Sequence, residues 1–294
     1  MKNQFSRRTA LKNMAGGAAV LASGMLLPER LQAAELLEVR LKGRIKHSVC
    51  KWCYKDIPLE ELAKAAKGMG LSSIELLGPD DWPTLKKHGL TCAMAWGAEK
   101  SLTEGFNDPK YHDELVASYE AMIPKVANAG LNNLICFSGN RNGMSDEEGM
   151  KNCAVGLKRL MKTAEKHKVT LSMELLNSKV NHKDYMCDHT AWGVELAKMI
   201  DSDQFKLLYD IYHMQIMEGD VIRTIKDNHT YISHYHTGGV PGRNEIDETQ
   251  ELFYPAIMRA IVDTGYKGFV GQEFIPASKD PLASLKQSVV ICDV

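Results

Sequence analysis

The sequence predicts an α/β protein in which residues 44–294 form a single (β/α)8 TIM barrel. Short apolar runs alternate with amphipathic stretches, and this alternation requires parallel strands because each return crossover carries a helix. A chain of 294 residues is long enough for such a domain, since α/β barrels commonly reach about 250 residues. After residue 43 no linker, low-complexity tract or block of like charge interrupts the chain, so one domain accounts for it.

The expected strands are short apolar runs over 45–54, 72–77, 91–96, 133–138, 170–176, 206–212, 231–237 and 268–275. Helical patterns lie between them, such as "PLEELAKAAKGMG" after the first strand and "DEEGMKNCAVGLKRLMKTAEKHK" after the fourth. Pro58 stands at a first helical turn, and Gly70 and Gly130 stand where helices end. An open doubly wound sheet is the alternative. It usually needs a glycine-rich loop after the first strand, where this chain has "KWCYKDIP".

Residues 1–34 are expected to be a twin-arginine signal peptide, followed by a linker over 35–43. Arg7 and Arg8 precede an apolar, glycine- and alanine-rich run over 14–27, and small residues after it offer a cleavage site. That run is too short to span a membrane, which takes about twenty residues. We therefore expect export through the twin-arginine route to the periplasm, with no stable membrane insertion after processing.

Charge and cysteine content describe an ordinary globular protein. The formal net charge of −1 gives no basic excess, so nucleic acid is not an expected partner. Seven cysteines are an odd number, so at least one should be free. Cys50 and Cys53 form a C-x-x-C within the first expected strand, with no second cysteine pair to complete a zinc site. We expect both to be buried core cysteines.

Four ionisable side chains stand near the ends of four consecutive apolar runs. Glu174 in "TLSMELLN" is flanked by leucines, where an unpaired buried carboxylate would be strongly unfavourable. The next three strands carry Asp210 in "LLYDIYH", His236 in "SHYHTGG" and Glu273 in "VGQEFIP". The C-terminal ends of barrel strands converge on one mouth, and clustered carboxylates need a cation. We therefore predict that these four residues bind one divalent metal ion.

Three carboxylates and one imidazole suit a fairly hard cation, so Mn²⁺ or Mg²⁺ is expected first, with Co²⁺ and Zn²⁺ as alternatives. Taken singly, Glu174 could cap a backbone, Asp210 could form a salt bridge, and His236 could be a hydrogen-bonded core residue. Glu75 ends the second strand in a similar way. We expect Glu75 to lie across the barrel from the sixth to eighth strands, as a supporting or substrate-side group.

The segments "MELLN", "YDIYHMQ", "HYHTGGVPGRNEID" and "GQEF", in this order and spacing, resemble the xylose-isomerase-like barrel superfamily. The similarity is greatest to its hydroxypyruvate isomerase branch and its ketose 3-epimerases, and it covers residues 44–294. By this resemblance the metal ligands are Glu174, Asp210, His236 and Glu273. His213 and Arg243 fall on substrate-contacting positions. Two positions depart from these branches: hydroxypyruvate isomerases often have glutamine at His236, and ketose 3-epimerases carry a second glutamate at Val180.

The resemblance implies a divalent-metal-dependent isomerase or epimerase of a small keto-sugar or keto-acid, acting through a metal-stabilised enediolate. A metal ion chelated by a carbonyl and its adjacent hydroxyl stabilises the charge that develops when a neighbouring proton leaves. Glu174 and Glu273 are the expected catalytic residues, one removing a proton and the other returning one. Return to the same carbon gives epimerisation, and return to its neighbour gives isomerisation. The sequence leaves both open.

Five residues are candidates for binding the substrate: His213, Arg243, His182, Trp52 and Trp96. The planar guanidinium of Arg243 suits a substrate carboxylate, and a solvated loop arginine is the alternative. His213 and His182 either polarise a substrate oxygen or support a metal ligand. Trp52 and Trp96 close the first and third strands, where they either form an apolar wall for a sugar face or pack in the core.

Three other functions compete with this one. A lyase or dehydratase acting on a keto-sugar or oxidised glycoside would use the same enolate chemistry and end in elimination. A non-catalytic carbohydrate-binding barrel would bind sugar without exchanging substrate hydrogen for solvent deuterium. An apurinic-site endonuclease shares the barrel but needs a trinuclear zinc cluster and a basic groove. The expected partner is a small-molecule carbohydrate or keto-acid, and a homo-oligomer is compatible with the sequence.

Overall fold

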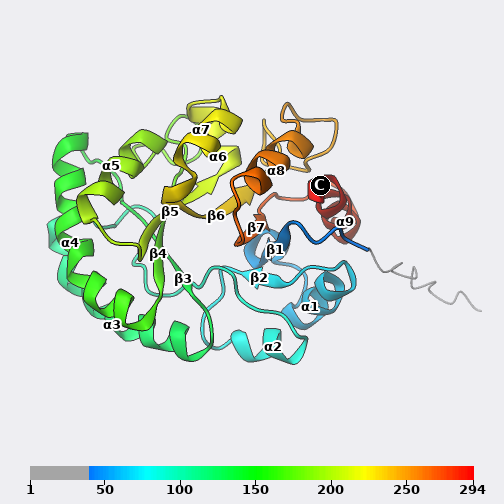
Figure 1. The fold of residues 1–294 in the computed structure, drawn as a ribbon, viewed down its shortest axis with the longest axis horizontal. Coiled ribbons are helices and arrows are strands. Elements are labelled where there is room, and N and C mark those ends of the chain that lie inside the picture. The colour runs from blue at the N-terminus through cyan, green and yellow to red at the C-terminus, as the bar shows by residue number, and fades with distance from the viewer. Residues whose placement is uncertain (1–39) are drawn as a thin grey trace, which may run out of the picture. The chain divides into compact units, whose positions relative to one another are not determined.

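A computed structural model describes residues 40–294, so the expected signal peptide and most of the expected linker lie outside the described residues. Within that range the strands form one parallel sheet in the order β2-β1-β7-β6-β5-β4-β3 (Figure 1). The strands are β1 (Lys46–Cys50), β2 (Ser73–Glu75), β3 (Asn133–Cys136), β4 (Thr170–Glu174), β5 (Phe205–Asp210), β6 (Ile232–Thr237) and β7 (Phe269–Gln272). The structure confirms an α/β barrel.

The third expected strand, residues 91–96, is not a regular strand. Thr91 bridges to Ser73 of β2, and Ala95 bridges to Leu77 and to Leu134 of β3, so both edges of the sheet meet at this segment. Main-chain bonds such as that from the Leu76 N–H to the Met94 carbonyl remain, but at Ala93 side chains replace the main-chain partners. The N–H of Ala93 donates to the Ser73 hydroxyl at 2.8 Å, and its carbonyl accepts from the Asn133 amide at 3.1 Å. A polar side chain on each neighbouring strand therefore satisfies the backbone of Ala93.

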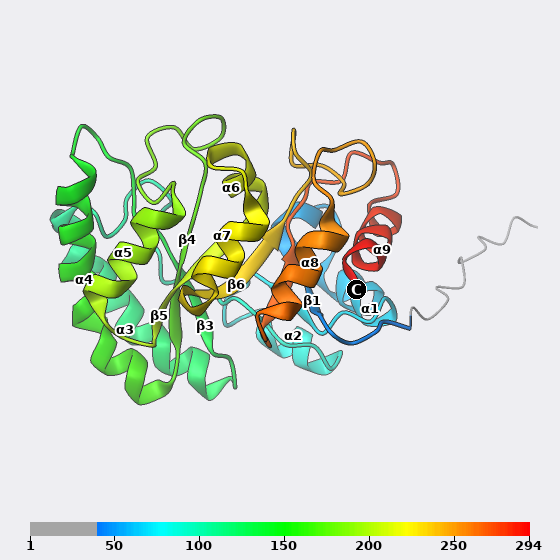
Figure 2. The ribbon, with the colours of Figure 1, turned by 45° about the horizontal axis from the view of Figure 1, so that its top comes forward.

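The helices form an outer layer around the strands, as two views of the ribbon show (Figures 1 and 2). They are α1 (Leu59–Gly68), α2 (Trp82–Lys87), α3 (His112–Asn128), α4 (Asp146–His167), α5 (Thr190–Ile200), α6 (Ile211–Met217), α7 (Val221–Asn228), α8 (Tyr254–Asp263) and α9 (Pro281–Cys292), with 3-10 turns η1 (Lys51–Tyr54), η2 (Pro109–Tyr111) and η3 (His229–Tyr231). No helix within residues 40–294 has the length and apolar character needed to cross a membrane.

Local sequence sets where the helices begin and how closely they pack. The Ser145 hydroxyl accepts from the N–H of Glu148 at 3.2 Å, which caps α4 at its first turn. One face of α4, with Leu157 and Leu160, is fully buried. Gly193 lets α5 approach the sheet, since a Cβ there would lie 2.8 Å from Cδ2 of Leu207 on β5. The main core therefore fills the layer between strands and helices.

The cysteines are free thiols in the structure, including both members of the C-x-x-C. Cys50 is fully buried, as expected, whereas Cys53 is half-buried. The first strand is also shorter than expected because β1 ends at Cys50 and the chain turns into η1. This turn carries Trp52 out of the sheet and over the barrel mouth.

Candidate active site

The structure brings together the four residues that the sequence assigns to a metal ion. Glu174 is the last residue of β4 and Asp210 the last of β5, His236 is next to last in β6, and Glu273 directly follows β7. One ligand-type atom of each lies within 4.8 Å of the other three. All four side chains are buried, although the C-terminal ends of barrel strands form the open face of the barrel. The cluster therefore sits at the floor of the mouth.

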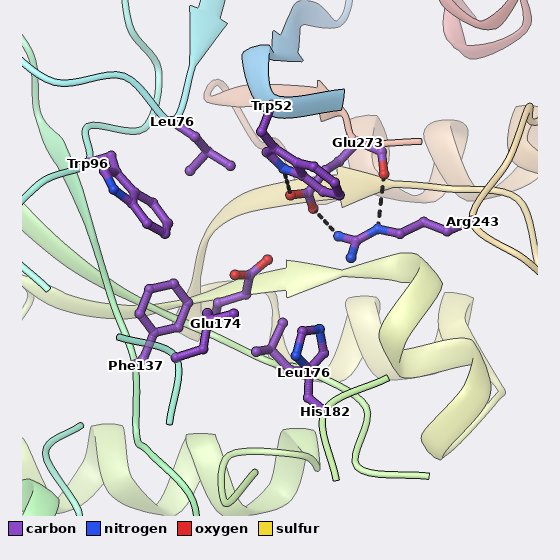
Figure 3. Close-up of a pocket in the computed structure, with 10 residues that line it drawn as sticks. Trp52, Leu76, Trp96, Phe137, Glu174, Leu176, His182, Arg243 and Glu273 are labelled. Carbon is purple, nitrogen blue, oxygen red and sulfur yellow. Dashed lines mark hydrogen bonds and ion pairs between the residues drawn. The ribbon is translucent and has the colours of Figure 1, made fainter. Parts of the chain in front are cut away.

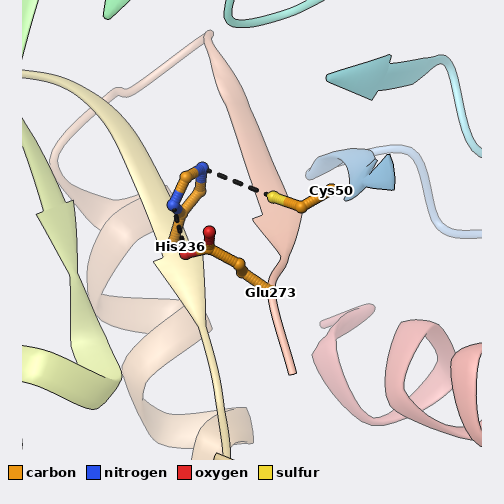
Figure 4. A group of neighbouring side chains, drawn as sticks. All are labelled: Cys50, His236 and Glu273. Atoms are coloured by element: carbon orange, nitrogen blue, oxygen red, sulfur yellow. Dashed lines mark hydrogen bonds and ion pairs between the residues drawn. The ribbon is translucent and has the colours of Figure 1, made fainter. Parts of the chain in front are cut away.

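His236 lies in the centre of the cluster. Its Nδ1 is 2.7 Å from Glu273 Oε2 and 3.4 Å from Glu174 Oε1. On the other side of the ring, Nε2 lies 2.7 Å from Glu75 Oε1 and 3.7 Å from Cys50 Sγ (Figure 4). A carboxylate accepts only, so Nε2 carries the proton. Nδ1 faces two carboxylates as well, so both ring nitrogens donate in this structure. Burial opposes a charge on the ring, but Cys50 and then Glu273 raise the pKa of His236 well above its usual value.

Glu75 is closer to the cluster than the sequence suggested. Its Oε1 accepts from Nε2 of both His234, at 2.6 Å, and His236. We expected Glu75 to lie across the barrel from the strands that carry the ligands. That expectation missed the contact, because an eight-stranded barrel is just wide enough for inward-pointing side chains to meet. Glu75 is fully buried, so the structure favours the supporting role over the substrate-side one.

Asp210 is held by the turn that follows its strand. It is the N-cap of α6, and its Oδ1 accepts from the N–H groups of Tyr212, at 2.8 Å, and His213, at 3.2 Å. Oδ2 is left to face the cluster, where it lies 3.0 Å from the guanidinium of Arg243. The strand-to-helix transition thus fixes the direction of the carboxylate.

Burial and charge affect the three carboxyl groups differently. Burial raises the pKa of Glu174, and the negative charge of Glu273 raises it further. Burial also raises the pKa of Asp210, to about 8, although Arg243 opposes this. Burial disfavours the charge of Glu273 too, but Arg243 and then His236 hold its pKa well below the usual range. The competing carboxylates favour a cation among them.

The side chain of His213 is fully buried. Its Nδ1 accepts the N–H of Asn177 at 3.1 Å, so the neutral ring carries its proton on Nε2. Nε2 lies 3.6 Å from Asp210 Oδ2 and has no hydrogen-bond partner among the described residues. Burial, and then the charge of Arg243, lower the pKa of His213 well below its usual range. The ring is thus neutral, with one N–H unused.

The residues of the cluster fit a divalent metal ion. Glu174 Oε1 is buried and has no hydrogen-bond partner in the described part of the chain, which is costly unless another group uses it. Three carboxylates and one imidazole are a donor set that suits Mn²⁺ or Mg²⁺. The hydrogen bond from His236 to Glu75 is the contact that metal-binding histidines usually make on their other nitrogen.

A pocket of about 470 Å³ lies directly above this cluster, and Figure 3 shows most of its lining. It is lined by Trp52, Leu76, Trp96, Leu102, Phe137, Glu174, Leu176, His182, Arg243 and Glu273. Four of the five predicted substrate-binding residues thus face it, and His213 does not.

Two of these predicted residues form polar contacts at the pocket. The indole N–H of Trp52 donates to Glu273 Oε1 at 2.7 Å, so this side chain is more than an apolar wall. The Arg243 guanidinium is 2.6 Å from Glu273 Oε2 and lies over the Trp52 ring, 5.2 Å from its centroid. Arg243 is therefore part of the buried cluster, and the alternative of a solvated loop arginine is wrong.

The sequence interpretation missed the apolar residues of the pocket. Leu76 directly follows β2, Phe137 directly follows β3, and Leu102 lies in the loop before α3. The first two directly follow their strands, the position that Glu273 has after β7. That shared position was the available signal, but an apolar residue after an apolar strand does not stand out in a sequence.

The protein is thus an α/β barrel with a buried cluster of three carboxylates and one histidine at its mouth. The chain belongs to the xylose isomerase-like TIM barrel family, whose model matches residues 54–289. A 2-oxo-tetronate isomerase from Pectobacterium atrosepticum is 25% identical over 246 residues, covering 77% of this chain and 90% of that protein. A human protein named for hydroxypyruvate isomerase is 31% identical over 104 residues, covering 35% of this chain and 38% of that protein.

Solved structures show the same fold. One is described as an AP endonuclease of family 2 from Brucella melitensis, with a TM-score of 0.73 and 23% identity over 82% of this chain and 97% of that one. Another is a 3-keto-D-glucoside 4-epimerase from E. coli, with a TM-score of 0.69 and 18% identity over 84% of this chain and 98% of that one. At these identities the likeness concerns the fold alone.

Proposed function

We propose that this protein is a divalent-metal-dependent isomerase or epimerase of a small keto-sugar or keto-acid. The observation that carries the proposal is the cluster itself. Ligand-type atoms from the ends of four consecutive strands lie within 4.8 Å of one another under a pocket, and the buried Glu174 Oε1 has no hydrogen-bond partner among the described residues. The name of the Pectobacterium relative, a 2-oxo-tetronate isomerase, supports the same reaction class.

The ligands of the ion would be Glu174, Asp210, His236 and Glu273. Bound there, a divalent cation polarises a substrate carbonyl and stabilises the negative charge of an enediolate. Glu75 orients His236 by accepting its Nε2–H, and the two N–H groups at the start of α6 orient Asp210. These contacts hold two ligands in place before a substrate arrives, which lowers the cost of reorganisation.

Glu174 and Glu273 move the proton in this proposal. Both oxygens of Glu273 are engaged, one by Trp52 and the other by Arg243, whereas Glu174 Oε1 has no hydrogen-bond partner in the described part of the chain. Burial also raises the pKa of Glu174, which makes it the stronger base of the two. We therefore assign proton removal to Glu174 and proton return to Glu273.

Arg243 and His182 position the substrate, and His213 supports Asp210. The guanidinium of Arg243 reaches the pocket beside Glu273, so its remaining N–H groups suit a substrate carboxylate or hydroxyl oxygen. His182 lines the same end, and its ring lies 5.2 Å from the ring of His213. The Nε2–H of His213 is 3.6 Å from Asp210 Oδ2, close enough to help orient that carboxylate.

Solvent exchange tests the proposal. The protein, loaded with Mn²⁺, is incubated in deuterated water with a panel of ketoses, 2-keto-acids and keto-glycosides, and products are analysed by NMR and mass spectrometry. An isomerase or epimerase incorporates deuterium next to the carbonyl and forms an isomer. Loss of water or of an aglycone would identify a lyase or dehydratase instead. Binding without exchange by any compound would identify a carbohydrate-binding barrel and refute the proposal.

We also propose export through the twin-arginine route to the periplasm, on the basis of Arg7, Arg8 and the apolar run over 14–27. Replacing both arginines with lysine should trap the uncleaved chain in the cytoplasm of a host that has this route. Cleavage and export of that variant at the normal level would refute the assignment.

A further inference from the structure

The pocket has a polar end and an apolar end. At the polar end lie Glu174, His182, Arg243 and Glu273. The opposite end, which we call the apolar wall, consists of Leu76, Trp96, Leu102 and Phe137. Figure 3 shows Trp96 and Phe137 across the pocket from Arg243 and Glu273, with Glu174 between them. Trp52 and Leu176 also lie at the polar end, Trp52 against Glu273 and Leu176 beside His182. A substrate bound over Glu174 therefore has one end near the charges and the other against the apolar wall.

The apolar wall is built on fixed parts of the barrel. The N–H of Leu76 donates to the carbonyl of Met94 at 2.9 Å, and the N–H of Trp96 donates to the carbonyl of Leu77 at 3.1 Å. The rings of Trp96 and Phe137 pack edge to face, with centroids 5.8 Å apart. Phe137 is only 2% exposed. These residues present a preformed surface, as rigid binding sites do.

The apolar wall does not suit a polyhydroxylated chain. Its four side chains carry a single polar group, the indole N–H of Trp96, so several hydroxyl groups placed there would lose water without gaining partners. The cavity of about 470 Å³ is also large for a three- or four-carbon keto-acid. Cavities of roughly 300–1,000 Å³ typically hold ligands of drug size.

We infer that the substrate carries an apolar group, such as an aryl or branched alkyl substituent, at the end remote from its carbonyl and adjacent hydroxyl. This inference rests on the proposed function, which places the carbonyl and hydroxyl over the carboxylate cluster. The substrate class is thus an α-hydroxy ketone or α-hydroxy keto-acid with an apolar tail, for example a keto-sugar that bears an aglycone. The four residues of the apolar wall determine this specificity.

Two matched pairs of compounds test the inference by isothermal titration calorimetry on the full-length protein loaded with Mn²⁺. One pair is 3,4-dihydroxy-2-oxobutanoate and 3-hydroxy-2-oxo-4-phenylbutanoate, and the other is erythrulose and 1,3-dihydroxy-4-phenylbutan-2-one. Within each pair a hydroxyl is replaced by a phenyl group and the reacting end is unchanged. We expect the phenyl compound of at least one pair to bind about tenfold more tightly or better. Equal binding, a preference for the hydroxyl compounds, or no binding of any compound would overturn the inference.

Variants locate the effect in the apolar wall. Leu102 is half-buried in a loop, so Leu102→Ser should fold and should weaken binding of the phenyl compound about tenfold, with little change for the hydroxyl compound. Val155→Ser is the matched control, because Val155 is 62% exposed on α4. An equal loss in both variants, or unchanged phenyl binding in Leu102→Ser, would contradict the assigned role of the wall.

Deuterium exchange separates the two proposals. If the hydroxyl compounds exchange hydrogen and the phenyl compounds bind no more tightly, the isomerase proposal is supported and the inference of an apolar tail is refuted. Tight binding of a phenyl compound without exchange in any of the four would support the apolar tail and count against the isomerase.

Discussion

Two halves of the barrel mouth place opposite chemistry at equivalent positions. In the half formed by β4 to β7, the strand ends carry Glu174, Asp210, His236 and Glu273. In the other half, Leu76 directly follows β2, Phe137 directly follows β3, and Trp96 closes the segment 91–96 between them. All seven side chains lie where a barrel presents residues to its pocket. One half therefore carries ionisable side chains and the other apolar ones, and our two proposals assign them to reaction chemistry and to substrate selection.

A single strand end can contribute side chains to both the ionisable half and the apolar half. Glu75 is the last residue of β2, yet its carboxylate points inward to His236 and serves the ionisable half. The next residue, Leu76, belongs to the apolar wall and has a left-handed backbone, with φ of 59°. Such a conformation costs a leucine about 1–3 kcal/mol, and it occurs at binding sites where surrounding structure enforces it. One strand end thus supplies both halves.

Removal of metal should have the largest effect, because it disables the ionisable half and leaves the apolar wall intact. We expect chelation followed by desalting to abolish isomerisation and solvent exchange, and Mn²⁺ to restore both at one ion per chain. Elemental analysis and the exchange assay measure this. Full activity in metal-free protein would contradict the proposal that the ionisable half acts through a bound metal ion.

Loss of either glutamate should have the next largest effect. Glutamine at position 174 or 273 keeps one oxygen for the ion but removes the base, so turnover should fall about a hundredfold or more. Metal occupancy at saturating Mn²⁺ should change little. Glu174→Gln should also lose solvent exchange, whereas Glu273→Gln should retain part of it, since Glu174 removes the proton. Glu195→Gln, on the outer face of α5, is the control. Near-normal turnover in both site variants would refute the two-glutamate mechanism.

Glu75→Gln should have a smaller effect, confined to the metal. An amide can donate to His236 Nε2, which would move the proton of the ring to Nδ1, on the side that faces Glu174 and Glu273. We expect the affinity for Mn²⁺ to fall about 10- to 100-fold, as for other residues that orient metal ligands. Competition with a fluorescent chelator measures it, with circular dichroism as the check on folding. Unchanged affinity in a folded variant would make Glu75 a structural residue only.

The pH dependence of metal binding should be the mildest effect. Burial raises the pKa of Asp210 to about 8 and also raises that of Glu174, so both carry protons more readily than ordinary carboxyl groups. An ion must displace these protons, and displacement of the Asp210 proton alone should lower the affinity by about tenfold per pH unit below pH 8. Titrations in buffers of different ionisation enthalpy count the protons. The same affinity at pH 6 and pH 8 would contradict this account.

The sequence by itself determined the barrel class and the four ligand-type residues. Parallel strands with intervening helices leave a periodic pattern along the chain, and a lone ionisable residue at the end of an apolar run stands out. Because parallel strands share one direction, the same position on consecutive strands must converge. Glu174, Asp210, His236 and Glu273 could thus be grouped without coordinates, and the structure places them together.

Only the tertiary structure decided which residues surround that cluster. The side chains of Ser73 and Asn133 interrupt the main-chain ladder at Ala93, and Glu75 contacts His236 across the interior. Leu76 and Phe137 became one wall of a pocket although 60 positions separate them along the chain. Such contacts depend on the width of the barrel and on the direction of each strand end. Neither leaves a local pattern in the sequence, because each arises when distant segments pack together.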